Sequence, residues 1–67
     1  MNAALETITI DIRGVNGPGR ATFAAAAWYE LAPVGKILAL HDALRDVTAG
    51  LPFAIVNTKS SQQELLP

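Results

Sequence analysis

The sequence predicts a small α+β fold of the order ββαβ, with one helix packed on a three-stranded, mainly antiparallel sheet. Three observations predict it: an alternating apolar and polar segment at residues 5–13, a glycine-rich turn directly after it, and an apolar stripe of helical spacing within residues 36–50. The chain is divided accordingly into one small α+β domain at residues 1–58 and a flexible C-terminal tail at 59–67.

The first strand is predicted at residues 5–13, LETITIDIR. Ile8, Ile10 and Ile12 alternate with polar residues, so the three isoleucines point to one face of a sheet and the polar residues to the other. Period-two spacing with β-branched residues is typical of a strand that is buried on one side only.

Residues 14–19, GVNGPG, predict the bend of a β-hairpin. Asn16 and Gly17 tolerate positive φ and form a strong hairpin signal. Pro18 cannot donate the hydrogen bond that closes a tight two-residue turn. A four-residue loop closed by Gly14 and Gly19 avoids this problem and keeps the same register.

Residues 20–31, RATFAAAAWYEL, fit two structures, because alanine favours a helix whereas the remaining pattern favours a strand. As a strand, the segment places Tyr29 in the core and Trp28 on the open sheet face. The predicted hairpin then pairs inward residues: Ile12 with Ala21, Ile10 with Phe23 and Ile8 with Ala25. The strand is preferred; the helical alternative gives the order βααβ.

The second half of the domain reads as a helix followed by a third strand. Within residues 36–50, an apolar stripe recurs at helical spacing, Leu38 lies off the stripe and is expected to be exposed, and Gly50 suits the position after the helix. The apolar run at 53–56 predicts a buried central strand at residues 51–58. The stripe consists of Ile37, Leu40, Leu44 and Val47.

Composition limits the function classes. The chain has 67 residues, no cysteine and a single histidine, so a thin core lacks disulfide support and a zinc site, which favours oligomerisation or a partner. The net charge of −1 makes nucleic acid an unlikely partner. The sequence shows no signal peptide and no convincing membrane helix, so a cytoplasmic protein that does not bind membranes is expected.

Candidate chemistry is sparse, and no catalytic residue, cofactor or metal is expected. The glycine-rich loop lacks the Lys-Ser/Thr of a phosphate-binding loop, because Arg20 and Ala21 follow Gly19. His41 is the only general-base candidate, and a residue at the border of the apolar stripe is the simpler interpretation. Asp42 and Asp46 are four residues apart and indicate a solvated acidic face rather than a cation site.

The predicted partner-binding surface is the open face of the sheet. Trp, Tyr and Arg are frequent at binding hot spots, and a tryptophan among alanines offers a flat platform. The two sheet edges carry few charges and little proline, so a homodimer with a continuous sheet is predicted. The candidate residues are Trp28, Arg20, Arg13, Glu30 and Leu38.

The leading hypothesis is a non-enzymatic protein-interaction module. In size and predicted topology the chain is similar to the small inhibitors that bacteriophages direct against host proteins, a likeness that carries no residues across. One alternative is a ligand-binding, anion-binding or enzymatic subunit whose site, with His41 and the flanking arginines, is shared across a homodimer. Another is weak single-stranded nucleic-acid binding through Arg13, Arg20 and Trp28.

Overall fold

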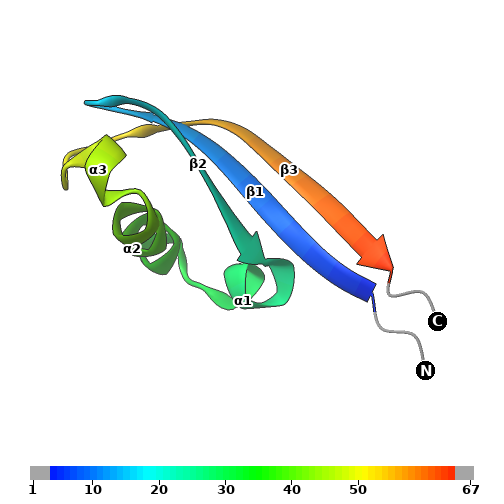
Figure 1. Cartoon of the computed structure of the whole chain (residues 1–67). Helices are drawn as coiled ribbons and strands as arrows, with labels where there is room; N and C mark the ends of the chain where they lie inside the picture. Colours follow the sequence, from blue (N-terminus) through cyan, green and yellow to red (C-terminus); the bar gives the residue numbers. More distant parts are fainter. Residues whose placement is uncertain (1–3, 65–67) are drawn as a thin grey trace.

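The computed structural model describes residues 4–64 and has one antiparallel sheet with helices on one of its faces (Figure 1). The sheet order is β2-β1-β3, so β1 is the central strand. This arrangement confirms the predicted α+β class with three antiparallel strands. The elements are β1 (Ala4–Gly14), β2 (Gly17–Ala24), α1 (Ala25–Glu30), α2 (Pro33–Ala43), α3 (Arg45–Thr48) and β3 (Ala54–Glu64).

The hairpin between β1 and β2 is confirmed, but its predicted register is wrong by two residues. The chain turns at Val15–Asn16, and Gly14 pairs with Gly17, which has a φ of 114° that favours glycine. Closing the turn one residue earlier places Pro18 inside an edge strand, where its missing N–H does no harm. A two-residue shift keeps every side chain on its predicted face, with Ile8 opposite Phe23 and Ile10 opposite Ala21.

Residues 20–31 adopt both of the predicted structures in succession. The strand ends at Ala24, and the alanines that follow begin the one-and-a-half-turn helix α1. Trp28 was predicted on the open sheet face and Tyr29 in the core, and both predictions are wrong because the helix reverses the two positions. Trp28 is 5% exposed and Tyr29 is 57% exposed.

The helix predicted within residues 36–50 is two helices, α2 and α3. The first, α2, starts earlier than expected, because Pro33 occupies its first turn. Leu44 leaves the helical conformation, with φ −125° and ψ 42°, and separates α2 from α3. Leu40 is fully buried, and Leu44 and Val47 pack against the core as predicted. Ile37, the remaining member of the predicted stripe, is exposed instead.

The third strand differs most from its prediction. It lies at the edge of the sheet rather than in its centre, and it runs to Glu64, so the predicted tail is wrong for residues 59–64. Residues 65–67 lie outside the described part of the chain. Main-chain pairing with β1 accounts for the extension, because hydrogen bonds of a ladder do not require apolar side chains. Val56 is an extra residue, a β-bulge, since Ile12 pairs with Ile55 and Asp11 pairs with Asn57.

The core lies between the isoleucine face of β1 and the helices. Trp28 stacks on Phe23 with ring centroids 4.9 Å apart, and the ammonium of Lys36 lies 5.6 Å from the Trp28 ring. The helices therefore cover β1 and β2, whereas the β1–β3 ladder continues past them (Figure 1). The buried apolar residues are Ile8, Ile10, Ile12, Ala21, Ala25, Trp28 and Leu40.

Candidate interaction surface

The most accessible element of the structure is β3. Every residue from Ala54 to Ser61 is exposed, on the face that the strand shares with the helices as well as on the opposite face. Its inner edge pairs with β1, and in the described structure no strand pairs with its outer edge. The backbone N–H and C=O groups along that outer edge are therefore open to a further strand.

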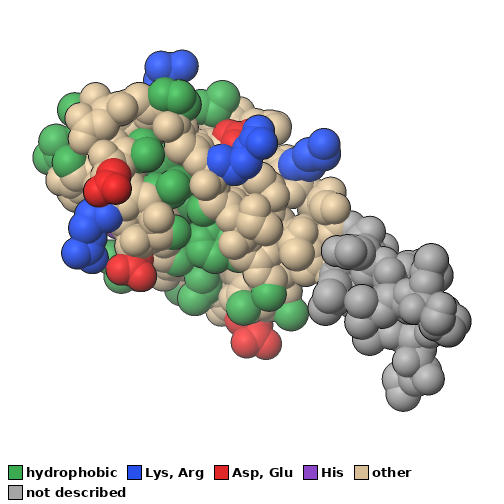
Figure 2. Space-filling model, in the orientation of Figure 1, with side chains coloured by type: hydrophobic (Ala, Val, Ile, Leu, Met, Phe, Trp, Pro, Cys, Tyr) green, Lys and Arg blue, Asp and Glu red, His purple; other side chains and the backbone are tan. Residues whose placement is uncertain are grey.

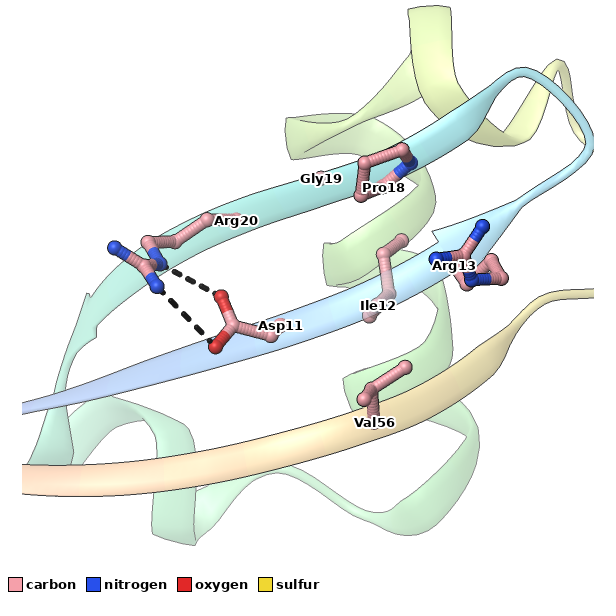
Figure 3. Close-up of a pocket in the computed structure, with 7 residues that line it drawn as sticks. All are labelled: Asp11, Ile12, Arg13, Pro18, Gly19, Arg20 and Val56. Atoms are coloured by element: carbon pink, nitrogen blue, oxygen red, sulfur yellow. Dashed lines mark hydrogen bonds and ion pairs between the residues drawn. The ribbon is translucent and has the colours of Figure 1, made fainter.

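An apolar groove lies beside the start of β3, on the side of α2. It has a volume of about 490 Å³. Ile37 is 47% exposed and Ile55 is 53% exposed within it, so large apolar side chains contact solvent. Val56, the next residue of β3, is also exposed and lies on the open face of the sheet (Figure 3). The groove residues are Ile37, His41, Gly50, Pro52, Phe53 and Ile55.

The opposite edge, on β2, is built differently. Its inward residues contribute to the core: Ala21 is buried and Phe23 is half-buried against Trp28. Pro18 interrupts its row of backbone donors. Hydrophobic side chains form a band between the helices and the sheet on the face shown in Figure 2, where the helices close over the sheet.

The open face of the sheet is polar and internally paired. The guanidinium of Arg20 donates from Nε to Oδ1 of Asp11 across a distance of 2.6 Å (Figure 3). This hydrogen bond from Arg20 lowers the pKa of the Asp11 carboxyl below its ordinary value and raises the pKa of Arg20. Thr9 and Thr22 share a hydrogen bond of 3.1 Å on the same face. Arg20 is therefore already engaged by a carboxylate.

The glycine-rich loop packs closely against α3. A Cβ on Gly14 would lie 2.6 Å from the carbonyl oxygen of Val47, and one on Gly19 would lie 2.8 Å from its side chain. The backbone N–H of Asn16 donates to that carbonyl at 3.0 Å, and its side-chain amide donates to the carbonyl of Asp46 at 2.9 Å. The loop donors are thus used to hold the carbonyl end of α3.

His41 is half-buried and engaged by its neighbours. Its Nδ1 shares a hydrogen bond of 2.9 Å with the hydroxyl of Thr48, and its ring meets Phe53 edge-on at 4.9 Å. The fully buried Thr48 hydroxyl also accepts from the N–H of Gly50 at 3.2 Å. These contacts tie α2 to the segment that leads into β3.

Asp42 lies on α2 and Asp46 on α3, and both are exposed. Asp42 lies 3.4 Å from the guanidinium of Arg45, and both side chains are strongly exposed. Within residues 4–64, no three potential ligands of the His, Cys, Asp and Glu types gather closely enough to hold a metal ion.

The five predicted partner-binding residues do not form one surface. Arg13 and Arg20 lie on the open sheet face as expected, and Leu38 is 63% exposed on α2. Glu30 is exposed but belongs to α1, away from that sheet face. Trp28, the proposed centre of the surface, is buried and cannot act as an exposed platform.

The sequence interpretation missed part of the exposed strand β3. The segment at 57–61 was assigned to the end of a buried strand and the start of a tail, because residues 59–67 are polar and have no partner pattern inside the domain. One feature of this segment was left without an interpretation: two apolar residues, Leu65 and Leu66, follow a long polar run in the sequence.

None of the helices in the described part of the chain has the length and apolar character needed to cross a membrane. No family model, no curated protein and no solved structure matches this chain.

Proposed function

We propose that this chain is a non-enzymatic protein-interaction module that binds a strand of its partner along the outer edge of β3. The observation that supports the proposal most directly is the exposure of every residue from Ala54 to Ser61 on a long edge strand. An added strand gains main-chain hydrogen bonds along the edge, and neighbouring pockets select its side chains.

The composition of β3 favours addition of a strand. Natural edge strands are commonly blocked by proline, by several charges or by brevity. From Ala54 to Glu64, β3 is eleven residues long and has two charged residues, Lys59 and Glu64, and no proline. Its single bulge at Val56 lies near its start, so the straight segment from Asn57 onward is left for pairing.

The alternative functions receive less support from the geometry. The nucleic-acid alternative relies on base stacking on Trp28, and that ring is buried against Phe23. An anion site between Arg13 and Arg20 competes with Asp11, which already accepts from Arg20. His41 lines the apolar groove, but its Nδ1 is already hydrogen-bonded to the hydroxyl of the buried Thr48.

A module of this kind can inhibit or regulate a larger protein by occupying one of its sheet edges, in keeping with the likeness in size to phage inhibitors. The test uses tagged chain as bait in a lysate of the cells that express it, with bound proteins quantified by mass spectrometry. The edge-blocked variant combines Thr58→Lys and Ser60→Lys, two exposed positions of β3 on the face of the β1 isoleucines. The matched control combines Thr22→Lys and Ala24→Lys, two exposed positions of β2.

We expect the wild-type bait and the β2 control to recover bound proteins that the β3 variant does not recover. Additional copies of this chain count among those proteins. A lysine side chain on an exposed position of an edge strand prevents a second strand from pairing there and disturbs no buried contact. Equal recovery by all three baits would overturn the proposal.

A further inference from the structure

We infer that the strand added to β3 is an extended segment of another protein with an acidic side chain opposite Lys59 and an apolar side chain in the groove beside α2. This inference rests on the proposed function and states the chemistry of its partner. Three observations support it: the charges of the open sheet face, the walls of the groove and the spacing between the two along β3.

The open face of the sheet is positively charged although the whole chain is not. Among the described side chains, that face carries three cations and one carboxylate, whereas the whole chain has a net charge of −1. Lys59 belongs to this face because it pairs with Thr9, and directly opposed residues of antiparallel strands point to the same face. The four charged residues are Asp11, Arg13, Arg20 and Lys59.

Two of these cations lie at or beside β3 without a carboxylate. Asp11 accepts from Arg20, and no ion pair among the described side chains involves Arg13 or Lys59. Lys59 is exposed on the edge strand itself. Arg13 and Val56 of β3 line the same hollow of about 430 Å³ on the open face (Figure 3). Opposite charges on adjacent strands stabilise a sheet, so an acidic side chain on the added strand complements this edge.

A second copy of β3 would not supply that acidic side chain. Two antiparallel copies of an edge strand are related by a two-fold axis, so the open faces of the two sheets would form one surface. That surface would combine the cations of both copies, and its only described carboxylates would be the two copies of Asp11, each engaged by its own Arg20. Charge complementarity therefore favours a different protein over a second copy.

The groove supplies the apolar part of the recognition. Its volume of about 490 Å³ is ample for a leucine or phenylalanine side chain, since a cavity of about 150 Å³ already admits benzene. Ile55 pairs with Ile12, whose side chain is on the helix side of β1, so a residue opposite Ile55 on the added strand also faces the helices. An apolar side chain there would remove Ile37 and Ile55 from water.

The spacing of the two features follows from the bulge. On β1, the partners of Ile55 and Lys59 are Ile12 and Thr9, which are three residues apart because Val56 is an extra residue. An antiparallel strand with the same spacing on the outer edge meets Lys59 first. It then has an acidic residue followed three positions later by an apolar one, and the odd spacing places them on opposite faces of the sheet.

The first experiment measures the binding of fluorescent octapeptides to the purified full-length chain by anisotropy. The acidic peptide is Thr-Thr-Glu-Thr-Thr-Leu-Thr-Thr, and the basic peptide has lysine in place of the glutamate. The wild type should bind the acidic peptide about tenfold more tightly, and Lys59→Glu should reverse the preference. Lys59→Gln should remove most of the preference without adding a like charge. Arg45→Glu is the matched control, because it makes the same change in net charge on α3 and should keep the wild-type preference.

The second experiment tests the groove with the same measurement. A peptide with serine in place of the leucine should bind the wild type about tenfold more weakly. Ile37→Ser, in the groove, should weaken binding of the leucine peptide about fivefold and leave binding of the serine peptide nearly unchanged. The matched control is Leu38→Ser, an exposed position of α2 that does not line the groove, and it should leave both affinities within about twofold.

A preference for the acidic peptide that reverses in Lys59→Glu, together with the dependence on Ile37, supports the inference. Equal affinity for the acidic and basic peptides, or no binding of either at about 1 mM, overturns it. An oligothymidylate that binds more tightly than the acidic peptide, or a wild-type dimer that Thr58→Lys combined with Ser60→Lys abolishes, also overturns it, because the edge would then have another occupant.

The bait experiment separates this inference from the proposed function. If the peptides fail but the bait still recovers proteins through β3, only the inference is wrong and the proposed function stands. If neither peptide binding nor capture depends on β3, both are wrong.

Discussion

The two edges of the sheet differ in what supports them. β2 carries Ala21 and Phe23 into the core under α1, so its side chains contribute to the stability of the fold. β3 is held chiefly by its ladder to β1, and its side chains from Ala54 to Ser61 remain exposed. The same three-stranded sheet therefore has one edge that contributes to the core and one edge that is exposed.

Trp28→Ala should show the largest effect on stability, because it removes the ring that joins α1 to β2. Burial is lost together with the stack on Phe23, at a cost of about 3–5 kcal/mol in the free energy of unfolding. Chemical denaturation followed by circular dichroism measures the change. Tyr29→Ala, one residue along and 57% exposed, should change stability by less than about 1 kcal/mol. Equal losses would contradict the assignment of β2 to the core.

Gly14→Ala should have the next largest effect, about 1–3 kcal/mol, because its new Cβ would overlap the carbonyl oxygen of Val47 and push α3 from the hairpin. Gly35→Ala is the matched control. Its Cβ would meet Leu31 at 3.5 Å, an ordinary contact, and alanine favours a helix. The same denaturation experiment compares them, and a loss in Gly35→Ala as large as that in Gly14→Ala would argue against the close approach.

Asp11→Asn should change how stability depends on pH. The folded-state pKa of Asp11 is lowered, chiefly by the hydrogen bond from Arg20, below the ordinary value of 3.8. A lowered carboxyl pKa contributes stability above that ordinary value, and the contribution disappears as the pH falls through the folded-state pKa. Urea midpoints between about pH 2 and 7 should therefore fall less steeply in Asp11→Asn than in the wild type. Asp42→Asn should follow the wild-type profile, since its partner Arg45 is more distant and more exposed.

The smallest effect on folding is expected from Thr58→Lys combined with Ser60→Lys. Both positions are exposed on β3, so the free energy of unfolding of the monomer should change by no more than about 0.5 kcal/mol. The measurement is made at low protein concentration, where association contributes least. A loss of several kcal/mol would show that β3 supports the core as β2 does, and would remove the distinction between the two edges.

The parts of the fold that follow local rules could be predicted from the sequence. The alternation of Ile8, Ile10 and Ile12 defined the central strand and its buried face, and the glycines around Asn16 defined a hairpin. The register within that hairpin depended on which residue pair closed the turn. Gly14 and Gly17 close it, so Pro18 lies in the edge strand β2 rather than in the loop. Such a shift by two preserves the faces, so the pattern of apolar residues alone could not reveal it.

The parts that depend on tertiary pairing could not be predicted. Trp28 moved from the surface to the core because the alanines before it started a helix in place of a longer strand. Residues 57–64 became a strand because β1 offers them an unpaired edge, not because of their own propensity. The candidate site was missed through these two errors, since its predicted centre is buried and residues 59–64 of the exposed strand β3 were assigned to a tail.

The pairing of Ala4 with Glu64 has a consequence for how the chain folds. These partners are separated by 60 positions (64 − 4), whereas the hairpin partners Gly14 and Gly17 are separated by three. Contacts between distant parts of a chain form slowly, because a large loop must close before they contribute. The hairpin and the helices should therefore assemble first, and for that interval the vacant side of β1 can accept β3 from its own chain or from another that is still folding.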